Sequence, residues 1–252
     1  MGVAAIVLAW VPAVLGADHW ASYAGEVGLG ALTWVLLLVL LRREDTHTRA
    51  QVAVVVVFAS LVEWGFSAGL HVYDYRLHEH DFWLRVPQFV PPGHGLVYLA
   101  ALRVGRDPRI RAHGRTLVRA VLVLGGLYAA YGLLLSGRTD VLGVLWFGCL
   151  VWFLLRGRQP LVYVGAFVIV TWLELWGTGV GAWTWAHRSP TGLIPMGNPP
   201  ADAAGGYGFF DAAALWIGPW LAAAATRLAG RFRGSVPASA PAASYVGAKS
   251  AP

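Results

Sequence analysis

The sequence of 252 residues is poor in charge, in cysteine and in lysine. Charged residues make up only 13% and apolar residues 57%, with a mean hydropathy of +0.58. A soluble domain carries roughly 25% charged residues, so this shortage excludes an ordinary soluble domain and indicates an integral membrane protein. Cys149 is the single cysteine, which excludes an intrachain disulfide.

The chain also lacks the signatures of several enzyme classes. It has no P-loop, no Asp-Asp-x-x-Asp diphosphate motif and no repeated His-x-x-x-His box, and we predict no cofactor. One loop, with His71, Asp74, His78 and His80, is a candidate metal site because imidazole and carboxylate together suit zinc, copper or iron. Its spacing matches no closed zinc signature, and the alternative is a solvated polar loop.

Eight apolar runs predict an all-α, polytopic fold with about eight transmembrane helices. A crossing helix needs ~20 residues, and the shorter runs have aromatic or arginine residues that complete a span. Pro12 interrupts the first run, which we interpret as a retained helix, with a signal peptide as the alternative. Residues 234–252, rich in Ala, Pro and Ser, are predicted to form a disordered tail. The runs are residues 3–16, 26–41, 51–70, 87–102, 117–135, 140–155, 161–181 and 207–226.

The basic residues fall mainly on one side of this topology. When alternate connections are placed on opposite sides, only four arginines, Arg76, Arg85, Arg138 and Arg188, lie on the sparse side. The positive-inside rule then places the rich side and both termini in the cytoplasm, with the helices in the plasma membrane. Of the 19 basic residues only Lys249 is a lysine, and this arginine bias suggests a GC-rich bacterial genome. The net charge of +6 is therefore attributed to topology and to contact with anionic membrane lipids, and no nucleic-acid partner is predicted.

Two passages of the chain resemble each other. Glu63 and Glu174 are each followed by glycines, by an aromatic-x-aromatic pair and by a proline-rich return, at 86–95 and 193–200. This pattern predicts two parallel four-helix repeats, residues 1–115 and 116–233. The alternative is that glycine, aromatic residues and proline recur at any outer membrane boundary.

The two glutamates are the first candidates for function. A charged residue deep in a membrane span costs at least ~2.5–3.5 kcal/mol, and such residues usually face a bundle interior or a cavity. Proline cannot continue a helix interior, so both returns are predicted to be irregular or re-entrant and to line a cavity that opens outward. Counting along the spans places His94 at the depth of Glu63, and Asp211 within reach of Glu174. We therefore predict that Glu63, His94, Glu174 and Asp211 perform acid–base catalysis.

A second set of residues is predicted to bind a substrate. Asn198 and Tyr207 are expected to form hydrogen bonds, and the rings of Tyr98, Tyr207 and Phe210 to hold an apolar or cationic molecule. Trp183 and Trp185 are interpreted as part of an interfacial aromatic belt.

Together these features favour a membrane enzyme that cyclises, hydrates or isomerises a lipid or isoprenoid. The alternatives are a proton-coupled transporter and a non-catalytic scaffold subunit in which the polar contacts only hold helices together.

Overall fold

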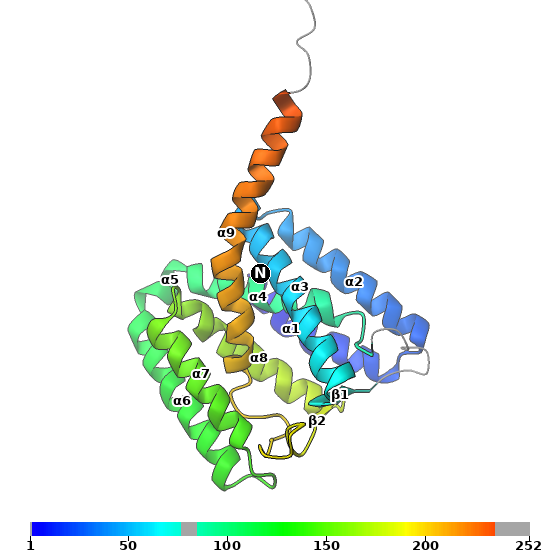
Figure 1. Cartoon of the computed structure of the whole chain (residues 1–252), viewed down its shortest axis with the longest axis vertical. Coiled ribbons are helices and arrows are strands. Elements are labelled where there is room, and N and C mark those ends of the chain that lie inside the picture. Colours follow the sequence, from blue (N-terminus) through cyan, green and yellow to red (C-terminus); the bar gives the residue numbers. More distant parts are fainter. Residues whose placement is uncertain (1, 77–84, 235–252) are drawn as a thin grey trace, which may run out of the picture.

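The computed structural model describes residues 2–76 and 85–234, and it is mostly helical (Figure 1). Within these residues, six helices are long and apolar enough to cross a membrane. The chain is thus a polytopic all-α membrane protein, as predicted. The six are α1 (Val3–Trp20), α2 (Tyr23–Leu41), α3 (Thr46–Glu63) with the π-helix η1 (Trp64–Gly69), α6 (Gly114–Leu134), α8 (Pro160–Gly179) and α9 (Ala204–Gly234).

The other two predicted spans are also helical but shorter. They form α4 (Val90–Arg106), with 17 residues, and α7 (Val141–Arg156), with 16. A five-residue helix, α5 (Pro108–Ala112), joins α4 to α6. All eight expected runs are therefore helices, while the number of crossings and the two repeats stay predictions.

The proline-rich returns differ from each other in structure. The first was predicted to be irregular as far as Gly95, but α4 already begins at Val90, with Pro91 and Pro92 in its first turn. Proline is tolerated there because the first N–H groups of a helix have no intrahelical acceptor. The second return, residues 193–200, contains no helix, as predicted.

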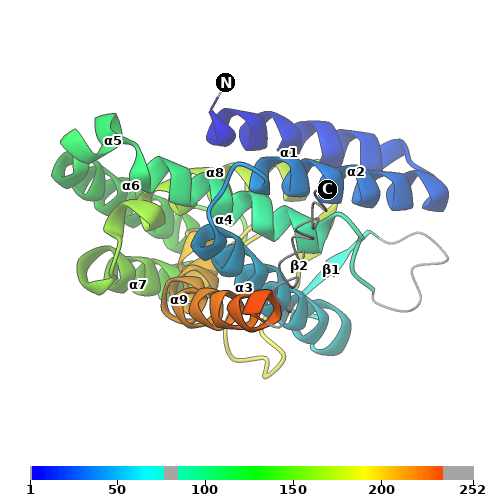
Figure 2. The same cartoon turned by 90° about the horizontal axis from the view of Figure 1, so that it is seen from above.

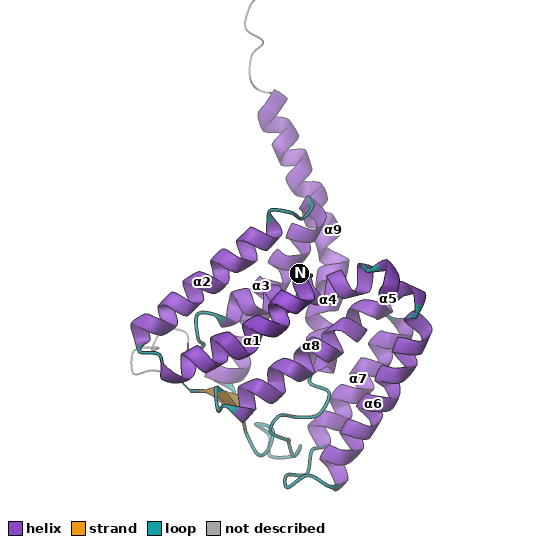
Figure 3. Ribbon diagram, turned by 180° about the vertical axis from the view of Figure 1, so that it is seen from behind, coloured by secondary structure: helices purple, strands orange, loops and turns teal. Residues whose placement is uncertain are grey.

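Small residues let the central helices approach closely. α4 and α8 cross where a Cβ on Gly105 would lie 2.9 Å from the Val162 nitrogen, and one on Gly165 would lie 3.0 Å from the Ala101 Cα. Such contacts are typical of helix packing in membranes, where van der Waals fit replaces the hydrophobic driving force. Figure 2 shows α4 between α1 and α2 on one face and α7 and α9 on the other, and Figure 3 shows α1, α2 and α8 from behind.

Two short strands, which the sequence did not predict, cover one end of the bundle. β1 (Tyr73–Tyr75) follows η1, β2 (Trp183–Trp185) follows α8, and the two pair antiparallel. We call this pair the aromatic ribbon. Arg138 donates to the carbonyl oxygens of Trp185 (2.9 Å) and Ala186 (2.7 Å), and so fixes β2 in place.

Arg76 anchors the other strand of the ribbon. Its guanidinium lies 3.3 Å from the Asp18 carboxylate at the end of α1 and donates to the Val180 carbonyl oxygen at 3.4 Å. Two of the four arginines on the sparse side thus have a structural reason to be there. Of the predicted tail, Gly234 belongs to α9, and residues 235–252 lie outside the described chain.

Candidate functional site

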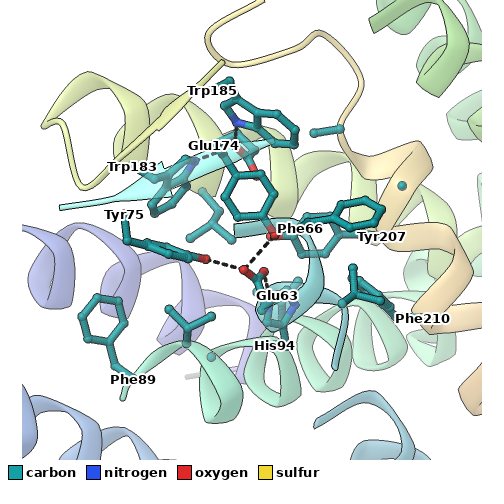
Figure 4. Close-up of a pocket in the computed structure, with 18 of the residues that line it drawn as sticks. Glu63, Phe66, Tyr75, Phe89, His94, Glu174, Trp183, Trp185, Tyr207 and Phe210 are labelled. Atoms are coloured by element: carbon teal, nitrogen blue, oxygen red, sulfur yellow. Dashed lines mark hydrogen bonds and ion pairs between the residues drawn. The ribbon is translucent and has the colours of Figure 1, made fainter. Parts of the chain in front are cut away.

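A cavity of about 400 Å³ lies under the aromatic ribbon (Figure 4). Its wall is mostly aromatic and aliphatic, with side chains from α1, α3, α4, α8 and α9. A few polar groups reach it from different elements, which is the usual composition of a small-molecule site. The lining residues with polar or ionisable groups are Glu63, Tyr73, Tyr75, His94, Trp146, Glu174, Trp183, Trp185 and Tyr207, together with Trp10.

Glu63 is held on both of its oxygens. Its Oε1 lies 2.7 Å from His94 Nε2, and its Oε2 accepts hydrogen bonds from the hydroxyls of Tyr73 and Tyr75, each at 2.8 Å. The residue ends α3 directly before the π-helix, a kind of segment that is frequent at functional sites. The carboxylate is buried, so its two tyrosine donors and His94 replace the water it would otherwise bind.

Glu174 is held in a matching way by the other strand. Its Oε2 accepts hydrogen bonds from the indole nitrogens of Trp183 (3.0 Å) and Trp185 (3.2 Å). Its Oε1 has no hydrogen-bond partner in the described chain, so this oxygen is available to a ligand. Gly177 makes room for this arrangement, because a Cβ there would lie 1.8 Å from the Trp183 ring.

The alternation of side chains along the strands explains why each glutamate has two donors. Residues two apart in a strand point to the same face, so Tyr73 and Tyr75 both reach Glu63. The pairing then sets Tyr73 beside Trp185, with ring centroids 4.7 Å apart, and Tyr75 beside Trp183, at 6.0 Å. All four rings line the cavity and donate to the carboxylates, and Figure 4 shows Tyr75, Trp183 and Trp185 in this arrangement. We call the four rings the roof of the cavity.

The electrostatics of the roof keep the tyrosines in their donor form. Burial, reinforced by the neighbouring Glu63 carboxylate, raises the pKa of Tyr73 and of Tyr75 well above the usual value. Both hydroxyls therefore stay protonated and neutral across the physiological pH range.

His94 is positioned by the first turns of α4 and by α9. The Tyr207 ring stacks on the imidazole with a centroid distance of 5.2 Å, and the Phe210 ring meets it edge-on at 5.5 Å. The Nδ1 atom is buried and has no hydrogen-bond partner among the described residues. The imidazole thus offers one nitrogen to Glu63 and keeps a second nitrogen for another proton partner.

The structure brings several of the predicted residues together. Glu63 and His94 are in direct contact, and Glu174, Tyr207 and Phe210 line the same cavity. The roles of these residues stay predictions.

Three other predicted residues lie outside the lining of the cavity. Asp211 and Tyr98 do not line the cavity, although each lies one helical turn from a residue that does. The expected contact between Asp211 and Glu174 is therefore not formed. Asn198 also lies outside the lining, and its Oδ1 instead accepts a hydrogen bond from the Trp185 backbone N–H at 2.9 Å.

The candidate metal loop is only partly described. His71 Nδ1 lies 2.7 Å from Asp74 Oδ1 on the surface, whereas His78 and His80 fall outside the described residues. Within residues 2–76 and 85–234, no group of three or more His, Cys, Asp or Glu side chains is placed to hold a metal ion.

The sequence analysis did not predict that the aromatic-x-aromatic pairs form hydrogen bonds to the glutamates. Trp183 and Trp185 were interpreted as belt residues, but both are buried and both donate to Glu174. The signal was the recurrence of such a pair after each glutamate. Residues 65–69 also match Gly-x-Ser-x-Gly, but they form the π-helix rather than the strand-to-helix elbow that this motif requires.

Comparison of the chain with protein-family models, with curated proteins and with solved structures found no match.

Proposed function

We propose that this protein is a membrane enzyme that performs acid–base chemistry on an apolar, unsaturated lipid of the isoprenoid kind. The observation that carries the proposal is an apolar, aromatic cavity in which two buried carboxylates, Glu63 and Glu174, are each oriented by two donors. Apolar substrates dissolve in the bilayer. A cavity with this lining excludes water, and electrostatic interactions inside it are therefore stronger than in water.

The Glu63–His94 pair is the proposed proton donor. A proton moves from the imidazolium to one carbon of a substrate double bond, and positive charge develops on the neighbouring carbon. Glu63 stabilises the charged imidazole before this transfer, while Tyr73 and Tyr75 hold the carboxylate in place. Proton transfer by a positioned side chain typically contributes ~10²–10⁴ in rate.

The aromatic ribbon is proposed to stabilise the cationic intermediate. The faces of Trp and Tyr rings attract positive charge, and the attraction is strongest where water is excluded. Glu174, whose Oε1 accepts no hydrogen bond from the described residues, then removes a proton from an adjacent carbon. One proton enters and one leaves, so the product is an isomer or a cyclised form of the substrate. If water attacks the cation instead, Glu174 accepts a proton from that water and the product is an alcohol.

This proposal includes the orientation in the membrane. The ribbon end of the bundle faces outward, and the end with Arg103 and Arg106 faces the cytoplasm of a bacterial cell, as do both termini. Arg103 forms an ion pair with Glu44, and Arg106 donates to Thr48 at 2.9 Å, so the inner ends of α3 and α4 are joined by charged and polar contacts. The proposed partners are membrane lipids and the apolar substrate.

The test uses solvent deuterium. The protein in nanodiscs is incubated in D₂O with a panel of acyclic isoprenoids and unsaturated lipids, and the products are analysed by mass spectrometry. We expect a product that carries deuterium at carbon, and a loss of at least ~10²-fold in rate for Glu63→Gln and for His94→Gln. Glu44→Gln is the matched control, because Glu44 is also a buried carboxylate but lies at the opposite end of the bundle.

Each alternative predicts a different result. Full turnover by both Glu63→Gln and Glu174→Gln would refute the proposed chemistry. Uptake of an unmodified compound into proteoliposomes, without deuterium in its carbon skeleton, would identify a transporter. A protein whose glutamate variants lose only thermal stability would be a scaffold.

A further inference from the structure

A layer of buried polar groups lies one helical turn below the cavity. Tyr98 follows His94 by one turn on α4, and Asp211 follows Tyr207 by one turn on α9, so each pair lies along one face of its helix. His94 and Tyr207 are stacked on each other. Val97 and Phe210, the chain neighbours of Tyr98 and Asp211, line the cavity.

The polar atoms of this layer are not satisfied by the described protein. The Tyr98 hydroxyl, the Asp211 Oδ2 and the His94 Nδ1 are all buried and lack a hydrogen-bond partner among the described residues. Their side chains are only 1%, 4% and 5% exposed. Buried polar groups are nearly always paired, and a water molecule with two to four polar partners is the common solution where protein atoms do not suffice.

The same layer extends toward the inner end of the bundle. The Asp211 carboxylate is close enough to act electrostatically on the hydroxyls of both Tyr98 and Tyr163. Tyr163 lies in the first turn of α8, after the short loop that carries Arg158 and follows Arg156 at the end of α7. Asp211 thus lies one turn further along α9 than Tyr207, as Tyr98 lies one turn further along α4 than His94.

We propose that Asp211, with enclosed water and the hydroxyls of Tyr98 and Tyr163, conducts protons between the inner face and His94. Asp211 in its protonated form gives a proton through Tyr98 or a water molecule to His94 Nδ1, and it regains one from the inner side past Tyr163. No electron is transferred, and one proton enters this route from the inner face for each proton that reaches His94. The inference rests on the proposed function, because each turnover leaves the Glu63–His94 pair one proton short and leaves one extra proton on Glu174, which Glu174 releases to the outer side before the next turnover.

The groups that face this route come from several helices. Glu63 from α3 and Tyr207 from α9 contact the imidazole of His94. Asp211 acts on Tyr98 of α4 and Tyr163 of α8, and Arg106 acts on Tyr98 from the inner end of α4.

The experiment follows the protonation of His94 without any substrate. The protein, with isotope-labelled histidine rings, is reconstituted in one orientation, and the pH is changed rapidly on one face while infrared spectroscopy records the imidazole bands. The His94 signal is identified by its loss in His94→Asn. We expect His94 to respond to the pH at the face that carries Arg106, and Asp211→Asn and Tyr98→Phe to slow that response at least tenfold.

Matched controls separate the route from general effects. Asp107→Asn changes an exposed acid, and Tyr131→Phe removes the hydroxyl of a tyrosine that is 53% exposed, so both should respond at the wild-type rate. If Asp211→Asn does not fold, the responses of Tyr98→Phe and Tyr163→Phe test the route instead, since both variants keep the ring and its packing.

The outcomes distinguish this inference from the proposed function. A wild-type His94 that follows the outer pH, or Tyr98→Phe and Asp211→Asn responses as fast as wild type, would overturn the route. Deuterium incorporation that still depends on Glu63 would then leave the proposed chemistry standing. A slowed response in the controls would equally overturn the assignment to these residues.

Discussion

The two hydroxyls on Glu63 offer a sharp test of how the site is built. Tyr73→Phe and Tyr75→Phe each delete one of the two donors to Oε2, and both keep the ring and its apolar packing. A hydrogen bond to a charged group contributes ~1.5–3 kcal/mol to stability. Each single variant should therefore lower the free energy of unfolding by about 1.5 kcal/mol, since the other tyrosine still donates.

The double variant should cost more than the sum of the two. Glu63 is only 5% exposed, so without either hydroxyl its Oε2 becomes a buried acceptor with no donor. Leaving such a group unpaired adds ~1–3 kcal/mol, and interaction energies of this size are measured for residues that share one partner. We expect the double variant to exceed the sum of the singles by at least ~1 kcal/mol.

The assay is reversible unfolding in mixed micelles, followed by tryptophan fluorescence. Tyr131→Phe is the control, because Tyr131 is exposed and should change stability by less than ~0.5 kcal/mol. Additivity within ~0.3–0.5 kcal/mol would show that the hydroxyls act independently, and would refute the shared role assigned to them. The pair Trp183→Phe and Trp185→Phe repeats the cycle at Glu174.

Two further predictions concern other parts of the fold. Gly177→Ala should displace the Trp183 ring, which lies 1.8 Å from the added Cβ, and should lower the free energy of unfolding by ~1–3 kcal/mol. Gly179→Ala is the control, because its Cβ would have no atom within 4 Å and should not destabilise the protein. Equal melting temperatures for the two variants would contradict this prediction. Burial, with the nearby Asp140 carboxylate, raises the pKa of Asp202 from 3.8 to about 7 in the folded protein. The folded state then binds more protons than the unfolded state between these values, so stability should fall as the pH rises toward 7. Asp202→Asn should flatten the dependence of melting temperature on pH, and a slope that survives the substitution would refute the assignment.

Much of the helical framework could be predicted from local sequence. Apolar runs such as 161–181 and 207–226 correspond to α8 and α9, because a membrane span requires a continuous stretch of apolar residues. The two glutamates were found for a related reason, since a carboxylate inside such a run is costly and rare. Helix lengths then sufficed to place His94 at the depth of Glu63.

Side-chain direction could not be predicted in the same way. Tyr98 and Asp211 follow the lining residues His94 and Tyr207 by one helical turn, yet neither lines the cavity. Depth along a span is counted in residues, whereas the face of a helix depends on how its neighbours pack. For this reason the predicted contact between Asp211 and Glu174 is absent.

The sequence by itself determined that this chain belongs in a membrane, where its helices lie, and which acids are buried in them, since each depends on composition within one segment. Only the tertiary structure decided what those acids touch. β1 and β2 come from distant parts of the chain, and their antiparallel pairing brings Tyr73 beside Trp185 over a common cavity. Local sequence cannot specify this pairing, because the two strands are far apart in the chain and each is positioned by the helix that precedes it.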